Sequence, residues 1–243
     1  SDNAISFDIG KNKKIKNLKV KSKINLDEIL INLNSTKPKK FILDYKKEII
    51  LKNNYLEIDY TEDKSKIQIE GDYSFNNNFD KFKLNLLKSS DNTKFDSTIE
   101  VLHNSIIIDE INYKKEKNIS SLINLKGDYK NNKEINFSNI KFVEGKNKIY
   151  VNNLDLSKKF KINYVDKLEL NYFNNNKKKN HISLIRDKNK YELISNVFDG
   201  KKSVNSLISG SSKKNILYIF DNLNSEIDLS LNQFFVDDVS YLK

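Results

Sequence analysis

The chain has 243 residues, a formal net charge of +10 at pH 7 and a pI of about 9.3, and 37% of its residues are hydrophobic. Soluble domains usually reach roughly 45–50%, so this content favours an elongated body with much surface, while the many Ile, Leu, Phe and Tyr residues argue against disorder. The absence of cysteine excludes disulfides and thiolate metal sites, and no run of about 18 apolar residues indicates a membrane-spanning helix.

Two stretches show the spacing of short amphipathic helices. The first follows Asn25 as N-cap and precedes Pro38, with apolar residues at i, i+3, i+4 and i+7: Leu26, Ile29, Leu30 and Leu33. The second follows Asp199-Gly200 and stops at Gly210, with apolar residues at Val204, Leu207 and Ile208. We therefore predict one or two short helices that cover an end or an edge of the fold.

Most of the chain between these stretches alternates apolar and polar residues with a period of two, which is typical of half-buried strands. The alternating segments span 67–75, 82–86, 95–101, 123–129, 135–142, 149–156, 160–164 and 168–172, and another spans 227–231. Clusters of Asn, Asp, Lys and Gly separate them and predict tight turns. The fold class predicted is all-β: an elongated, twisted antiparallel meander curled into a groove or half-open barrel. Residues 1–243 form a single β-rich fragment, with 1–120 and 121–243 as its alternative halves.

A weak internal sequence repeat accompanies the alternation. The segment 67–73 ends in Gly71-Asp72-Tyr73, and the segment 123–129 ends in Gly127-Asp128-Tyr129, 56 positions later. Such a spacing suits a repeat of several strands, although a match by chance is equally compatible with so biased a composition.

The residue types that carry chemistry form no recognisable constellation. His103 and His181 are the only histidines, and neither has a second ligand at the spacing of a metal site. No nucleophile elbow and no glycine-rich phosphate loop is present. We therefore predict a protein that is not an enzyme, with no catalytic residue, no metal and no cofactor.

The apolar residues of the alternating segments are the candidate site. We predict that they form a lipid-facing track: Ile67, Ile69, Tyr73, Ile123, Leu125, Tyr129, Ile162, Tyr164, Leu168, Leu170, Ile227, Leu229 and Leu231. Alternation indicates that these residues are covered but not what covers them, so the packed core of a closed barrel or sandwich is an equal alternative for each.

The positive charge comes almost entirely from lysine, since Arg186 is the only arginine. Proteins that read nucleic acid usually rely on arginine, whose guanidinium makes paired contacts to bases and phosphates. The basic runs 11–14 and 177–179 also lack the interleaved aromatic residues of a stacking platform. Solubility explains the charge better, so we expect no specific nucleic-acid partner and keep charge-driven binding only as a second alternative.

One element in the second half of the chain carries a family resemblance. Phe198-Asp199-Gly200 leads from an alternating strand into the predicted helix of the segment 196–208, and 216–220, 223–231 and 149–156 continue the strand-rich pattern. This pattern, mainly in residues 120–243, resembles the AsmA-like envelope proteins of diderm bacteria, in particular their YhdP-type branch.

The resemblance implies a periplasmic segment of a larger protein, anchored to the inner membrane by a helix outside this fragment. It implies a long curled sheet that binds or conducts phospholipid acyl chains between the inner and outer membranes, with no catalytic residues. The partners implied are phospholipid or another acyl-chain lipid, neighbouring segments of the same parent protein and an envelope protein. The alternative function is a structural or assembly module of the cell envelope that pairs through its sheet edges.

Overall fold

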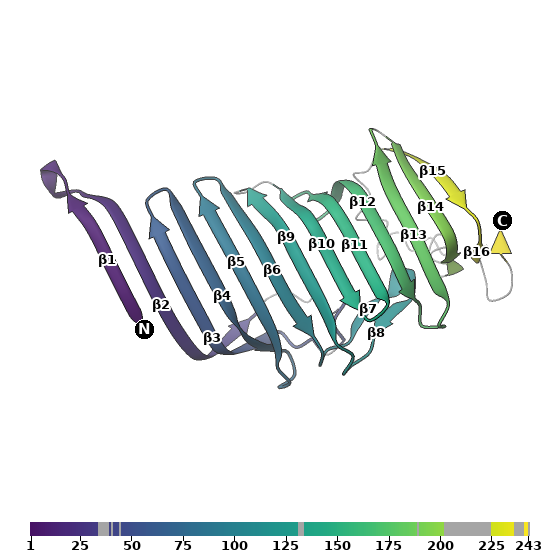
Figure 1. Cartoon of the computed structure of the whole chain (residues 1–243), viewed down its shortest axis with the longest axis horizontal. Helices are drawn as coiled ribbons and strands as arrows, with labels where there is room; N and C mark the ends of the chain where they lie inside the picture. The colour runs from purple at the N-terminus through teal and green to yellow at the C-terminus, as the bar shows by residue number, and fades with distance from the viewer. Residues whose placement is uncertain are drawn as a thin grey trace.

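The computed structural model describes residues 1–33, 39, 41–43, 45–130, 134–188, 190–201, 225–235 and 241–242. Fifteen of its seventeen strands form one sheet. The strand order follows the chain except that β6 is followed by β9 and that β14 pairs with both β15 and β16. Figure 1 shows these strands side by side in a long curled array, with β1 at one end and β15 and β16 at the other. The first and last strands do not pair, so the sheet stays open. The all-β prediction is confirmed.

The strands of the first half are Asp2–Ile9 (β1), Ile15–Asn32 (β2), Glu48–Thr61 (β3), Lys64–Ser74 (β4), Asp80–Ser89 (β5) and Asn92–Val101 (β6). A small separate pair follows, Ile106–Ile108 (β7) and Tyr113–Lys115 (β8). The sheet resumes with Ser121–Lys130 (β9), Ile135–Glu144 (β10), Asn147–Leu156 (β11), Ile162–Phe173 (β12), Lys179–Asp187 (β13) and Lys190–Asp199 (β14). It ends with Glu226–Leu231 (β15), Phe234–Phe235 (β16) and Tyr241–Leu242 (β17).

Neighbouring strands from β1 to β14 are antiparallel, as expected for a meander, whereas β15 and β16 pair with β14 in parallel. The turns use residues that tolerate a left-handed backbone. Asn77 between β4 and β5 has φ of 71°, and Gly145 between β10 and β11 has φ of 53°. β6 pairs with β9 over ten residue pairs, so the sheet runs without interruption across residue 120.

The helix predicted over 26–33 is wrong. Residues 26–32 belong to β2, an 18-residue strand that pairs with β3 from Lys19 to Asn32. Leu26 and Ile29 are both half buried, although residues three positions apart in a regular strand point to opposite faces. The pairing with β3 is interrupted between them, where Asn53 of β3 has φ of 52°. An irregularity in a strand thus imitates helical spacing. The second predicted helix, over 204–210, lies outside the described residues.

The connection between β6 and β9 turns back onto one face of the sheet. It contains β7, the short 3-10 helix Asp109–Ile111 (η3) and β8, and we call the segment 106–115 the plug. Figure 1 shows β7 and β8 along the lower border of the sheet, near β10 to β12. Ile42 forms an isolated bridge with Ile106, so a second piece of chain lies beside the plug. Within the described residues, no helix is long and apolar enough to cross a membrane.

Candidate functional site

One row of directly paired residues crosses twelve strands of the sheet. We call it the middle row: Ile24, Leu56, Ile69, Leu84, Ser97, Leu125, Ile140, Val151, Leu168, Leu184, Leu193 and Leu229. Paired residues project from the same side of a sheet, so eleven apolar side chains and one serine define a single apolar face.

Most of the middle row is only half buried. Near Leu184 it belongs to a cluster with Val165 and Tyr191, whose further members come from the sheet strands β11 to β14. Leu168 and Leu193 also pack against the cluster that contains Tyr113 of the plug, so this part of the row has neighbours in the sheet and toward the plug. A sheet normally buries its apolar face against another layer, so a half-buried row of this length is a candidate interaction surface.

A second row beside the middle row is covered in two different ways. It consists of Phe82, Ile99, Ile123, Phe142, Ile149, Leu170 and Ile182. On β10 to β13, the plug packs directly against the second row. Tyr113 of the plug is 1% exposed and packs edge-to-face on Phe142, with 5.9 Å between ring centroids, and on Tyr172, with 5.8 Å. This part is a closed core.

On β3 to β6 and β9, the same face borders an apolar cavity of about 350 Å³. We call it the apolar cavity. Its lining consists of Ile42, Ile49, Leu51, Tyr73, Phe75, Phe82, Leu84, Ser97, Ile99, Val101, Asn104, Ile106 and Ile123. Ligand sites of about 300–1,000 Å³ are typically lined by apolar groups with a few polar ones. Here the polar lining residues are Tyr73, Ser97 and Asn104, so the cavity suits an apolar chain.

A buried polar network holds the start of the β6–β9 connection beside the cavity. The carboxylate of Asp80 accepts hydrogen bonds from the backbone N–H groups of Leu102 and His103 and from Asn104 Nδ2. Lys115 Nζ donates to the carbonyl oxygens of Leu102 and Asn104, at 2.9 and 2.8 Å. Burial lowers the pKa of Lys115, while the charges of Asp80 and Glu144 act in the opposite direction. The network fixes the connection by charge-assisted hydrogen bonds.

Three buried tyrosines donate hydroxyl hydrogen bonds, one within the sheet and two between the sheet and the plug. Tyr73 donates its hydroxyl to the carbonyl oxygen of Glu100, Tyr172 to that of Ile111, and Tyr113 to the carboxylate of Glu144. Burial is the main cause that raises the pKa of each phenol, and neighbouring carboxylates raise it further. All three therefore remain neutral hydrogen-bond donors well into the alkaline range.

The structure brings most of the predicted track residues onto the apolar face. Tyr73 and Ile123 line the apolar cavity, and Ile69, Leu125, Leu168 and Leu229 belong to the middle row. Ile67 and Tyr129 share the parity of these residues along β4 and β9, and Leu170 lies in the second row. Ile227 and Leu231 lie two positions from Leu229 on β15 and share its face, and Ile227 and Leu229 are 55% and 65% exposed. Ile162 is buried opposite Leu156.

Tyr164 differs from the other track residues. Its ring lies under the guanidinium of Arg186, 4.8 Å from the ring centroid, and burial and the charges of Asp155 and Asp166 raise the pKa of its phenol. It also borders a hollow with charged residues, including Asp128 and Glu134. The structure therefore places Tyr164 in polar surroundings, because a register shift between Asp155 and Leu156 changes the alternation there.

Sequence reasoning missed three of the segments that line the cavity, one of which is β3 with Ile49 and Leu51. Ile42 and Ile106 come from short pieces without alternation, so a period of two could not identify them. Asn104 lies in the same connection and carries no apolar signal. Phe82, Leu84 and Ile99 were recognisable as strand residues, but only the strand order places them beside Ile123.

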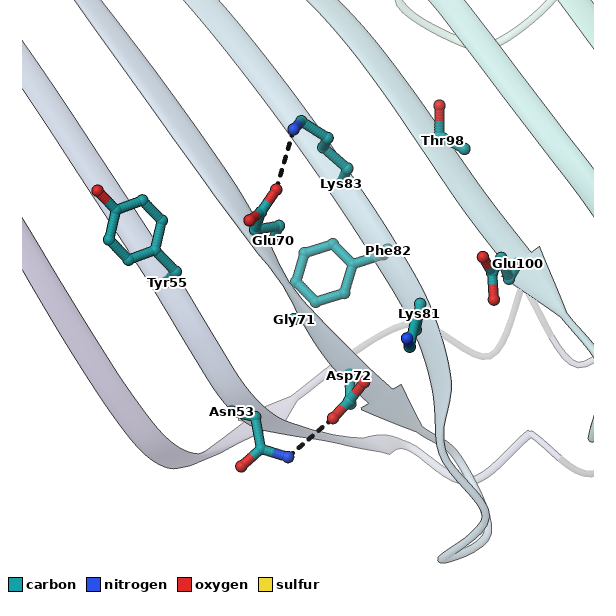
Figure 2. Close-up of a pocket in the computed structure, with 10 residues that line it drawn as sticks. All are labelled: Asn53, Tyr55, Glu70, Gly71, Asp72, Lys81, Phe82, Lys83, Thr98 and Glu100. Carbon is teal, nitrogen blue, oxygen red and sulfur yellow. Dashed lines mark hydrogen bonds and ion pairs between the residues drawn. The ribbon is translucent and has the colours of Figure 1, made fainter.

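The opposite face of the sheet is polar, with a hollow near Gly71 (Figure 2). Lys83 Nζ lies 2.9 Å from Glu70 Oε2, and Asn53 Nδ2 donates to Asp72 Oδ2 at 2.8 Å. The side chains of Lys83 and Glu70 are 53% and 52% exposed, so water screens this pair. Because most of its charged groups are exposed to water, this hollow is a weaker ligand site than the apolar cavity, although it is larger, at about 470 Å³.

Across the part of the chain that the structure describes, no group of three or more His, Asp or Glu residues has the arrangement of a metal site. His103 follows β6 and His181 lies in β13, and the two histidines are in separate parts of the sheet. Comparisons with protein-family models, with curated proteins and with solved structures found no match to this chain. A functional argument therefore rests on the apolar face and its cavity.

Proposed function

We propose that this chain is a non-enzymatic, periplasmic segment of an AsmA-like envelope protein and that its apolar face binds or conducts phospholipid acyl chains between the inner and outer membranes. The observation that carries the proposal is the half-buried middle row, which crosses twelve strands and passes the apolar cavity through Leu84 and Ser97. Burying apolar surface contributes about 25 cal/mol per Å², so an acyl chain on this row would be held without any polar contact.

The direction of the row supports conduction as well as binding. Its residues lie next to one another across the strands, and neighbouring strands are about 4.8 Å apart, so the apolar surface follows the long axis of the sheet in Figure 1. An acyl chain that moves from one strand to the next exchanges one set of apolar contacts for a similar one. The barrier to sliding is therefore small, and no bond is made or broken.

A cavity-filling substitution tests the proposal. Ser97 is 8% exposed, belongs to the middle row and lines the cavity, so Ser97→Leu puts a side chain where an acyl chain would lie. Excluding about two methylenes, at about 0.8 kcal/mol each, lowers affinity about tenfold. The measurement is native mass spectrometry after incubation with phosphatidylethanolamine vesicles, scored as the fraction of protein that carries lipid.

The matched control is Thr98→Leu, which adds a similar side chain at the next position, on the opposite face. We expect the control to bind lipid as the original chain does. Equal lipid binding by Ser97→Leu and Thr98→Leu, or no lipid on the original chain, would refute the proposal.

A second candidate function, assembly through a sheet edge, is favoured by β1. This strand has a partner on one side only within the described residues, and Ile5, Phe7 and Ile9 are 65%, 48% and 71% exposed. An apolar edge strand is a template for pairing with another strand. Light scattering over a range of protein concentrations tests this function: we expect self-association that Ile5→Lys abolishes, and a monomer at every concentration would count against it.

A further inference from the structure

Asn104 is the most unusual polar residue at the apolar cavity. It is 1% exposed, lies between β6 and β7, and lines the cavity together with apolar residues such as Ile99, Val101 and Ile106. A buried amide normally uses both its oxygen and its nitrogen in hydrogen bonds. Whether Asn104 does so determines what the cavity can accept.

The nitrogen of this amide is committed. Asn104 Nδ2 donates to Asp80 Oδ2 at 3.2 Å, and because a carboxylate only accepts hydrogen bonds, the amide nitrogen and not its oxygen must face Asp80. The backbone at Asn104 is also held, since Lys115 Nζ donates to its carbonyl oxygen. The side chain therefore cannot simply turn over to exchange its two ends.

The oxygen of the amide, Asn104 Oδ1, is buried and has no hydrogen-bond donor among the described residues. Tyr73, the neighbouring donor in the cavity wall, already gives its hydroxyl hydrogen to the carbonyl oxygen of Glu100, at 2.8 Å. A buried acceptor without a donor is unfavourable, and a ligand that brings a donor to this wall removes the deficit.

We propose that the apolar cavity selects an acyl chain that carries a hydroxyl group, and that this hydroxyl donates its hydrogen to Asn104 Oδ1. The inference rests on the proposed function and deepens it, because it distinguishes hydroxylated from plain chains at the same site. The apolar lining holds the hydrocarbon, and Asn104 reads the single polar group. A plain chain leaves the oxygen unpaired, and a charged group would meet an almost wholly apolar wall.

Two isomeric probes test the inference on the full chain: n-decanol, which has a donor, and methyl nonyl ether, which has none. Each affinity, measured by displacement of a fluorescent fatty acid, is divided by the partition coefficient of the probe between hexadecane and water. This division removes the difference in solubility. We expect n-decanol to bind about tenfold more tightly than its partitioning predicts relative to the ether, as one satisfied buried hydrogen bond provides.

A substitution assigns this preference to Asn104. Asn104→Leu keeps the size of the side chain but removes both the acceptor and the donor to Asp80, which retains the backbone N–H donors of Leu102 and His103. We expect the corrected preference to fall to about one, with the affinity for the ether unchanged within about twofold. If this variant fails to fold, the comparison of the two probes on the original chain still decides the matter. Equal corrected binding of the two probes overturns the inference alone, whereas failure of both probes to bind overturns the proposed function with it.

Discussion

The apolar face of this sheet can be compared in two parts, which share a strand pattern and differ in what lies on them. On β10 to β13, the plug brings Tyr113 and Ile111 against the second row, and Tyr172 and Phe142 are buried there. On β3 to β6, Ile42 and Ile106 approach the same face, yet a cavity of about 350 Å³ remains between them and the sheet.

The difference shows that one sheet combines a packed part with a part that leaves an open space. In the packed part, Tyr113 makes edge-to-face contacts with two rings and is 1% exposed. In the cavity part, the rings of Tyr73, Phe75 and Phe82 pack on one another along the wall, with centroids 5.7 and 6.2 Å apart, and leave the centre empty. The packed part stabilises the fold, and the other part leaves the space in which we propose that an acyl chain binds.

The largest expected effect on stability comes from replacing an isoleucine by alanine, once in each part. Ile182→Ala opens a new void in the packed part, where Ile182 is 5% exposed, and should lower the free energy of unfolding by about 3–5 kcal/mol. Ile99→Ala only enlarges a cavity that exists already, so the loss should be about 2 kcal/mol. Urea denaturation measures both values. Equal losses would show that the two parts are packed equally well.

An intermediate effect concerns Gly71 and Gly127, each beside an irregularity in the next strand. A Cβ on Gly127 would lie 2.1 Å from the carbonyl oxygen of Asn136, which is backbone, whereas one on Gly71 would lie 2.4 Å from Asn54 Oδ1, which is a side chain. We expect Gly127→Ala to destabilise by about 3 kcal/mol and Gly71→Ala by about 1 kcal/mol. Thermal denaturation tests the order, and a larger loss at Gly71 would contradict it.

The smallest effect comes from removing one phenol hydroxyl. Tyr172→Phe keeps the ring but loses the 2.9 Å hydrogen bond to the carbonyl oxygen of Ile111, and should cost about 1 kcal/mol at neutral pH. Burial, with the charge of Asp199, raises the pKa of Tyr172 in the folded state. Its stabilising contribution is therefore complete below the unfolded value of about 10 and is lost as the pH rises further.

The pH dependence of the unfolding free energy, measured for the original chain and for Tyr172→Phe, tests this expectation. We expect the gap in unfolding free energy between the original chain and Tyr172→Phe to narrow above about pH 10. The lowered pKa of Lys115 makes the protein more stable as the pH rises toward the unfolded lysine value of about 10.4, but Lys115 is present in both proteins and its effect cancels from the gap. A gap that stays constant up to pH 11 would show that Tyr172 is not buried as described.

Much of the fold could be predicted because alternation is a local signal. The segments around Ile69, Leu125 and Leu168 were recognised as strands, and each lies in the sheet. Phe160 was wrongly included in a strand: it lies in the turn before β12, with φ of 58°. At such irregular positions, as at Asn53, the local pattern no longer reports which face a residue occupies.

The structure gives a physical explanation for the weak sequence repeat that pairs Gly71-Asp72-Tyr73 with Gly127-Asp128-Tyr129. Each glycine lies next to an irregularity of the adjacent strand, where a Cβ would collide with Asn54 or Asn136. Similar local geometry is thus associated with similar residues, and a glycine in a strand often marks such a close approach.

Side-chain alternation and turn residues are sufficient to predict that most of the chain after residue 67 is a meander of strands with one apolar and one polar face, because these signals act over a few positions. Which part of the apolar face is filled depends on the tertiary structure. The plug, Ile42 and Asn104 reach that face through contacts between residues far apart in the chain, such as Tyr113 with Tyr172 and Asp80 with Asn104. Such contacts depend on volumes and hydrogen-bond partners in space, which no local pattern records.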